Sequence, residues 1–523
     1  MKIQADTLRT FKVVHTWTGL LAGLVLFLAF YAGAFTVFRE DISVWQAGAP
    51  HRLTDEAMQD VTPLVERVIT AHPESRSGLM INLPDAHEGG VEAVWRNKER
   101  DTFHARLGAD GALQLGDAGG QRLSVVIDNL HRTAGIPGLG GELLLGTVAF
   151  IYGLALVSGV ILYLPVLRRD LFALRIGTNL KLLWQDAHNS IGVLSLPFHI
   201  LFALTGAVMS LHDPLLVGMN VLIYGEEGKS HLMRTVMPVA MPKPSGEQAP
   251  LLPATTLLST ARQQIPDFVP QHLIYLHPGD RAGVVTMMGD QGGVLGHSSR
   301  VAMSAVTGEV LAVEVAGARP TGTSALSSLA ALHFGDYGGR PVQWLYFCLG
   351  MAGAFLFYSG NLMWLEARRK RRAQTAAWHH QALARLTMGV CLGSCVGIPV
   401  LFIAVKMGVA GLGVGLMPLF WCTVVLALVW SALRPPVKGA RELLAAAAAA
   451  TAGIPLSSVM AAVTVQSTWR LTGIDLAALA GVLFFSVLAR QVGRRARQTT
   501  GGSVWDAPAS AAPTGKTAGS HSE

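Results

Sequence analysis

The chain has 523 residues, of which 51% are hydrophobic and only 14% are charged. This balance excludes an ordinary soluble enzyme and indicates a membrane protein with several spanning helices. The net charge of +7 does not indicate a nucleic-acid-binding protein, because the basic residues cluster beside apolar segments, where they set the orientation of the chain in the membrane.

Eight segments are apolar for long enough to cross a bilayer, which takes about 20 residues. They are residues 13–38, 141–166, 188–211, 342–366, 386–405, 411–433, 443–465 and 471–489. Clusters of Lys and Arg fall between alternate segments, so eight crossings with both termini in the cytoplasm place every cluster on the cytoplasmic side. Lys406 and Arg470 are isolated exceptions on the outer side. The first segment is longer than the apolar core of a signal peptide, so we expect an uncleaved anchor.

This topology divides the chain into seven parts. They are a first spanning helix (1–38), an outer domain (39–137), spanning helices two and three with a basic loop (138–211), a second outer domain (212–338), a fourth spanning helix (339–370), a C-terminal module of four spans (371–492) and a disordered cytoplasmic tail (493–523). Each outer segment begins with a helical pattern and continues with alternating strand-like runs. The predicted fold class is a polytopic α-helical membrane protein, with about eight transmembrane helices and two small α+β extracytoplasmic domains.

The first 370 residues contain a tandem duplication of span, outer domain and span. The second and fourth spans share the sequences SGVILYLPVLRR (158–169) and SGNLMWLEARRK (359–370). The first and third spans match at one constant offset, with His15, Gly19 and Gly33 against His188, Gly192 and Gly206. Each returning span is also preceded by a histidine. The duplication therefore predicts two pairs, His15 with His188 near the cytoplasmic face and His131 with His333 near the outer face.

Ionisable residues inside spans are costly and suggest function. Imidazole is a good ligand for haem iron, and two histidines on facing helices can hold a porphyrin between them. Zinc or copper is the rival interpretation, but these histidines lie at depths too different to converge on one ion. Arg132 follows His131 and is suited to a haem propionate, because guanidinium groups bind carboxylates well.

His199 has no repeat partner, because its counterpart in the first span is Leu26. On one continuous helix it would lie 11 residues after His188, nearly on the same face and roughly 16 Å away in depth. Two interpretations stay open for it: a ligand of the outer haem that replaces one member of the outer pair, or a hydrogen-bonded core histidine.

Several common catalytic motifs are absent from the sequence. It contains no GxGxxG after a strand, no P-loop, no Ser-His-Asp arrangement and no HExxH. No site for NAD, flavin or ATP is therefore expected. Electrons would come from quinol or a cytoplasmic reductase, and the acceptor would lie on the outer side.

Several short motifs together resemble the PepSY-associated transmembrane helix family of bacteria. They are the HxxxG starts HTWTG and HNSIG, the LHR and LHF segments before returning spans, and the VTGEVL turn at 306–311. The resemblance covers about residues 10–372 and implies an inner-membrane protein with two PepSY-like outer domains. It also implies two b-type haems, held at His15, His131, His188 and His333. The first outer domain departs from the TGEVL pattern, since it reads LGADGAL.

Some members of this family are ferric-siderophore reductases. The resemblance therefore implies reduction of a ferric siderophore, or another periplasmic acceptor, with release of ferrous iron. Two alternatives remain. One is a PepSY-type binding or regulatory protein without redox activity, and the other is a transporter, which the duplicated spans and the extra four-helix module permit. In each case the partners include membrane lipid and no nucleic acid.

Overall fold

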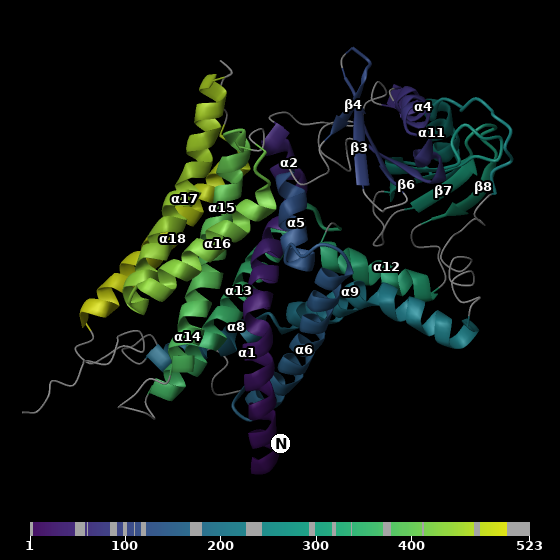
Figure 1. The fold of residues 1–523 in the computed structure, drawn as a ribbon. Helices are drawn as coiled ribbons and strands as arrows, with labels where there is room; N and C mark the ends of the chain where they lie inside the picture. The colour runs from purple at the N-terminus through teal and green to yellow at the C-terminus, as the bar shows by residue number, and fades with distance from the viewer. Residues whose placement is uncertain are drawn as a thin grey trace, which may run out of the picture.

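The computed structural model describes a helical bundle with a β-sheet beside one end of it (Figure 1). The described residues are 4–47, 58–59, 61–83, 91–97, 102–108, 110–116, 122–167, 180–225, 243–291, 299–315, 321–335, 337–369, 378–409, 413–464 and 471–498. The expected disordered tail (493–523) begins too early, because the last described helix (Gly473–Gln498) includes residues 493–498. Residues 499–523 lie outside the described residues, as do Arg470 and most of the basic clusters after the second and fourth spans.

Seven helices of the described chain are long and apolar enough to cross a membrane. They are α1 (Ala5–Thr36), α6 (Leu139–Tyr163), α13 (Gly339–Arg369), α14 (Trp378–Thr387) continued through a π-helical turn (Met388–Leu392) into α15 (Gly393–Lys406), α16 (Leu416–Leu433), α17 (Pro436–Thr464) and α18 (Gly473–Gln498). The protein is therefore a multi-pass helical membrane protein, and seven of the eight expected spans are single helices.

The third expected span, 188–211, is not one helix. It is divided into α8 (Leu180–Leu194) and α9 (Leu196–Tyr224), which are bent by 72° at the break. Pro197 lies in the first turn of α9, where it removes a backbone N–H donor and disfavours a helical conformation in the residue before it. The expectation that His188 and His199 share one face of a continuous helix is therefore wrong.

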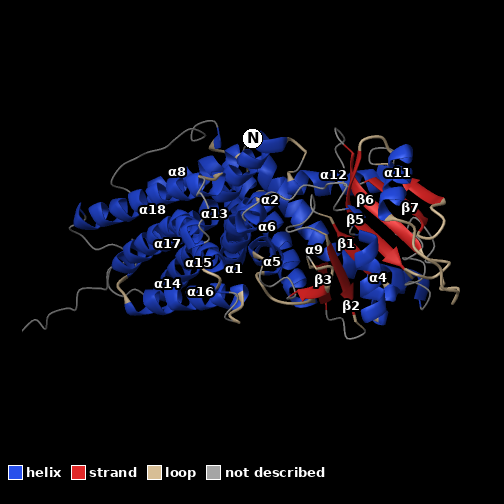
Figure 2. Ribbon diagram, turned by 90° about the horizontal axis from the view of Figure 1, so that it is seen from above, coloured by secondary structure: helices blue, strands red, loops and turns tan. Residues whose placement is uncertain are grey.

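The outer segments form one antiparallel sheet, with strand order β4-β3-β2-β1-β5-β6-β7-β8. The strands are β1 (Leu79–Asn82), β2 (Glu92–Arg96), β3 (Thr102–Leu107), β4 (Leu113–Gly116), β5 (Phe268–Leu276), β6 (Val284–Gln291), β7 (Ser299–Ser304) and β8 (Val310–Glu314). Each segment supplies four strands and one helix, α4 (Val61–Ala71) or α11 (Ala254–Gln264). Figure 2 shows both helices beside this sheet, away from the bundle.

The two halves of the sheet are joined by β1 and β5, which pair from Leu79 with Tyr275 to Asn82 with His272. The apolar faces of α4 and α11 belong to one continuous core with the strands of both halves. Pairing β1 with β5 removes two exposed strand edges, which would otherwise be open to association with other chains. The expectation of two separate outer domains is thus replaced by one fused α+β unit.

Three shorter helices connect this sheet to the bundle: α2 (Arg39–Ala47), α5 (Leu123–Thr133) and α12 (Thr321–Phe334). All three fall within the outer domains expected from the sequence, but α5 packs on α1 and α12 packs on α9. α9 itself extends to Tyr224, past the boundary expected at 211. The outer unit proper is therefore smaller than expected, and α5 and α12 belong with the bundle.

A buried carboxylate ties the sheet to α5. Glu92 on β2 pairs with Arg106 at 3.2 Å and with Arg122, the N-cap residue of α5. His104 lies 3.3 Å from the same carboxylate. Burial, together with the charge of Arg106, lowers the pKa of His104, which favours the neutral imidazole. The two arginines are then the charges that compensate Glu92.

We expect Glu92→Gln to lower the free energy of unfolding by about 3 kcal/mol, because breaking a buried ion pair leaves uncompensated charge. Thermal unfolding in detergent measures this loss. The matched control is Glu247→Gln, which removes an exposed pair with Arg281 and is expected to cost less than about 1 kcal/mol. Equal losses in the two variants would contradict the structural role of Glu92.

Candidate functional site

Four histidines meet in two pairs inside the bundle. His15 on α1 faces His188 on α8, with ring centroids 6.3 Å apart and planes at 80°. His131 on α5 faces His333 on α12, with centroids 6.0 Å apart and planes at 38°. The structure thus brings together the same two pairs that the duplication predicts.

The two pairs lie at different levels of α1. His15 is on this helix, and the backbone carbonyl of Ala29 on the same helix accepts a hydrogen bond from His131. Ala29 follows His15 by 14 positions in α1, which is about 21 Å along the helix axis. The pairs are therefore stacked through the thickness of the bundle, one far from the sheet and one close to it.

The pair far from the sheet has a defined tautomer. His15 Nδ1 donates to the Ala155 carbonyl at 2.8 Å, and His188 Nδ1 donates to the Leu356 carbonyl at 3.1 Å. A carbonyl can only accept, so Nδ1 carries the proton and Nε2 keeps its lone pair in both rings. Among the described residues, neither Nε2 atom has a hydrogen-bond partner. Both are therefore available to a metal ion.

The environment of this pair repeats in detail. The hydroxyls of Ser158 and Ser359 lie 3.4 and 3.3 Å from the Nδ1 atoms of His15 and His188. The next residue in each case is a glycine, Gly159 or Gly360, where a Cβ atom would lie 2.9 or 3.3 Å from the imidazole ring. The two Ser-Gly pairs belong to the repeat seen in the sequence, but the repeat alone does not predict that they contact the histidines.

The histidines of the pair near the sheet have the same tautomer, but their Nδ1 atoms donate to two different kinds of acceptor. His131 Nδ1 donates to the Ala29 carbonyl at 2.8 Å, whereas His333 Nδ1 lies 2.7 Å from the Thr205 hydroxyl. That hydroxyl donates its own proton to the Leu201 carbonyl at 2.7 Å, so it accepts from His333. The repeat does not predict a role for Thr205, because Ala32 occupies the matching position of the first span.

The separation of the rings suits one metal ion between each pair. Metal–imidazole bonds are about 2 Å long, and the ring centre lies roughly 1 Å beyond the nitrogen, so two opposed imidazoles on one ion have centres about 6 Å apart. The described residues contain no group of three or more His, Cys, Asp or Glu side chains that could hold a metal ion. Two facing imidazoles without further protein ligands among the described residues would suit haem, which would bring the remaining ligands of its iron with it.

His199 belongs to neither pair. It is fully buried, with Nδ1 2.6 Å from the Tyr152 hydroxyl and Nε2 2.9 Å from the Ser195 hydroxyl. Because Ser195 donates to the Ile191 carbonyl, its oxygen accepts from His199 Nε2, and Tyr152 donates to Nδ1. Both ring nitrogens are thus satisfied, which favours the core-histidine interpretation over a ligand.

Aromatic side chains fill the layer between the pairs. Phe30 lies at its centre, 5.0 Å from Phe357 and 6.2 Å from Phe202 between ring centroids. Phe202 in turn lies 4.7 Å from the ring of His333. A Cβ atom at Gly353 would come within 2.4 Å of Phe30, so this glycine makes room for the cluster. These aromatic contacts connect the interior between the two sites.

Arg132 is placed beside the pair near the sheet but does not join it. Its side chain is 56% exposed, and its Nε lies 3.6 Å from Asp128, one turn earlier on α5. An exposed guanidinium next to His131 could bind the propionate of a haem held by His131 and His333. That role of Arg132 stays a prediction.

The family model of the PepSY-associated TM region matches residues 13–367. The chain belongs to this family. A similar protein is the uncharacterized protein PA4219 of Pseudomonas aeruginosa (strain PAO1), which is 27% identical over 305 residues, covering 55% of this chain and 74% of that protein. All four paired histidines lie within the part that matches the family. The helices from α14 to α18 lie outside it.

The variant Tyr152→Phe tests whether His199 is a hydrogen-bonded core histidine. The variant keeps the ring but leaves His199 Nδ1 buried without a donor, so we expect a loss of about 1–3 kcal/mol in the free energy of unfolding. Thermal unfolding provides the measurement. Tyr337→Phe is the control and should cost less, because Tyr337 is a half-exposed residue whose hydroxyl contacts that of Tyr346. A Tyr152→Phe variant as stable as the wild type would show that this hydrogen bond does not hold His199.

Proposed function

We propose that the protein is a di-haem b oxidoreductase that passes electrons across the membrane. One haem would lie between His15 and His188, and the other between His131 and His333. The observation that carries this proposal is the distance between the ring centroids of each pair, 6.3 and 6.0 Å. The hydrogen bonds of the four Nδ1 atoms leave the Nε2 atom of each histidine unprotonated. Haem iron would supply the one-electron chemistry at each level.

The chain's own part is to hold the imidazoles and to exclude water. Each Nδ1–H donates to a carbonyl or a hydroxyl, which fixes the ring orientation and raises the basicity of Nε2. Ala155, Leu356, Ala29 and Thr205 supply these acceptors. The aromatic layer around Phe30 keeps the interior apolar, and such an environment is one of the levers that set a haem potential.

The direction of electron flow follows from the topology that the basic clusters predict. With both termini in the cytoplasm of a bacterium, the His15 pair lies near the inside of the inner membrane and the His131 pair near the periplasm. Quinol or a cytoplasmic reductase would be the donor. The fused outer unit, with its two PepSY-like halves, would stand on the acceptor side, tied to α5 through Glu92 and Arg122.

A ferric siderophore is the acceptor that the family resemblance favours. One electron converts its ferric iron to ferrous iron, which siderophores hold weakly, so reduction releases the metal. The enzyme would then be a haem-dependent ferric-siderophore reductase. A binding or regulatory protein is the alternative, in which the histidine pairs only join helices.

Absorption spectra and haem content of purified single-histidine variants test the proposal. We expect the wild type to show reduced b-type bands with two haems per chain. His15→Ala and His188→Ala should each lose the same haem, and His131→Ala and His333→Ala should each lose the other, because each haem would be held by both histidines of one pair.

The controls are His199→Asn and His379→Ala. His199→Asn is expected to keep both haems, and so is His379→Ala, which alters an exposed histidine at the start of α14. Colourless protein from haem-supplied cells would refute the proposal and favour the binding protein. Reduction of ferric chelates by the coloured protein would then identify the acceptor.

A further inference from the structure

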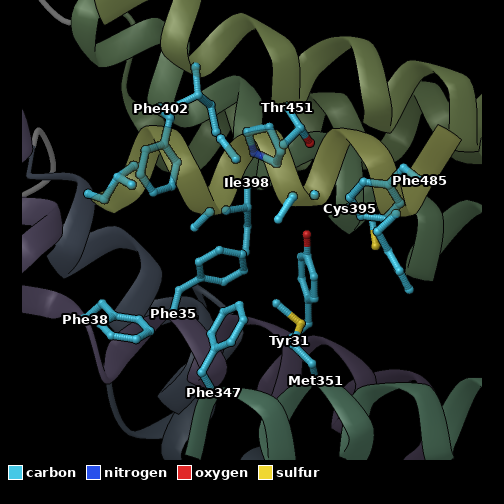
Figure 3. A pocket seen from close by; sticks show the side chains of 18 of the residues that line it. Tyr31, Phe35, Phe38, Phe347, Met351, Cys395, Ile398, Phe402, Thr451 and Phe485 are labelled. Carbon is cyan, nitrogen blue, oxygen red and sulfur yellow. The ribbon is translucent and has the colours of Figure 1, made fainter. Parts of the chain in front are cut away.

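A large apolar cavity separates the family part of the chain from the C-terminal module. Its volume is about 2020 Å³, and it lies between α1 and α13 on one side and α15, α17 and α18 on the other. Figure 3 shows Tyr31, Phe347 and Met351 projecting into it opposite Ile398 and Phe402. Pockets for small molecules are typically about 300–1,000 Å³, so this space suits a longer, amphiphilic molecule.

The charged residues of the lining gather where the helices end toward the sheet. Arg340 is at the start of α13 and pairs with Asp41 on α2 through two hydrogen bonds. Lys406 ends α15, and Asp475 lies in the first turn of α18. Glu40 completes the set. The remainder of the lining is mostly aliphatic and aromatic, so the cavity has one charged end and a long apolar body.

Aromatic rings at the same end indicate the level of the membrane interface. Trp45 and Trp344 both line the cavity there, and Trp344 packs on Phe38 with ring centroids 4.9 Å apart. Tryptophan is enriched where the hydrocarbon of a bilayer meets the headgroups. The charged end therefore lies at headgroup depth, and the apolar body lies at the depth of acyl chains.

Lys406 is the basic residue of α15 that the positive-inside pattern leaves unexplained. Its ammonium donates to the Trp45 carbonyl and lies 4.4 Å from the centroid of that indole ring. An ammonium has three N–H donors, and among the described residues the Trp45 carbonyl is its one hydrogen-bond acceptor. Asp475, across the cavity end, is engaged by Thr472 and Ser458 in capping α18. Two donors of Lys406 remain for a ligand.

We propose that this cavity binds a zwitterionic diacyl phospholipid whose head carries a phosphate and a primary amine. The phosphate accepts charge-assisted hydrogen bonds from Lys406. The amine lies beside the carboxylates of Glu40, Asp41 and Asp475, which outnumber the two cations and disfavour a head with net negative charge. The acyl chains fill the body between α13 and α18, so the lipid joins the C-terminal module to the family part.

Lipid analysis of protein purified in a mild detergent, from membranes that contain both zwitterionic and anionic phospholipids, tests this site. We expect the wild type to retain at least one phospholipid per chain, enriched in the amine-bearing zwitterionic class. Lys406→Gln should lower the retained amount roughly tenfold, because a charge-assisted hydrogen bond is lost. Lys406→Arg should retain it, and so should Lys438→Gln, which removes an exposed cation outside the cavity.

Ala480→Trp is a second probe that does not depend on charge. Ala480 lines the cavity and is exposed, so a larger side chain there occupies acyl-chain space without disturbing a packed interior. Retention equal to the wild type in both Ala480→Trp and Lys406→Gln would overturn the proposal, and so would recovery of quinone or of anionic lipid from the site. Haem content is measured separately, so this outcome leaves the proposed electron transfer unaffected.

Discussion

The hydrogen bond from each histidine Nδ1 to an acceptor on a neighbouring helix is the constraint on which the rest of the site depends. It fixes the ring orientation and leaves Nε2 directed away from the backbone that holds it. The acceptor helix must approach closely, which explains the glycines at 33, 159 and 360, where a Cβ atom would crowd an imidazole. Small residues in the spans are thus required by the site as well as by helix packing.

The internal repeat preserves this constraint unequally at the two levels. For His15 and His188, the carbonyl, serine and glycine of the acceptor helix all correspond. For His131 and His333 they do not, because the 72° bend between α8 and α9 has no counterpart in α1, which is one helix. A backbone carbonyl serves one ring and the Thr205 hydroxyl the other. The second site therefore lacks the repeat's symmetry, and the Thr205 hydroxyl takes the place of a backbone carbonyl as the acceptor for His333.

Sequence alone predicts the spans and the histidine pairs well, because both depend on patterns that repeat along the chain. It does not predict the break of the third span, where Pro197 outweighs a continuous apolar run, or the pairing of β1 with β5, which depends on contacts across about 190 residues. The role of His199 depends on its contacts in the fold, because one of its two partners, Tyr152, lies 47 residues away in the sequence. Thr205 was missed because the repeat has no polar residue there.

One helix sets the distance between the two candidate haem sites. α1 carries His15 and also provides, at Ala29, the acceptor that orients His131, so the spacing of the levels equals a fixed length of α-helix. The same helix lines the cavity through Tyr31 and Phe35 on its other side. Any molecule in that cavity would therefore contact the helix that carries His15 and orients His131. This shared wall gives the C-terminal module, which lies beyond the family match, a physical connection to the histidine pairs.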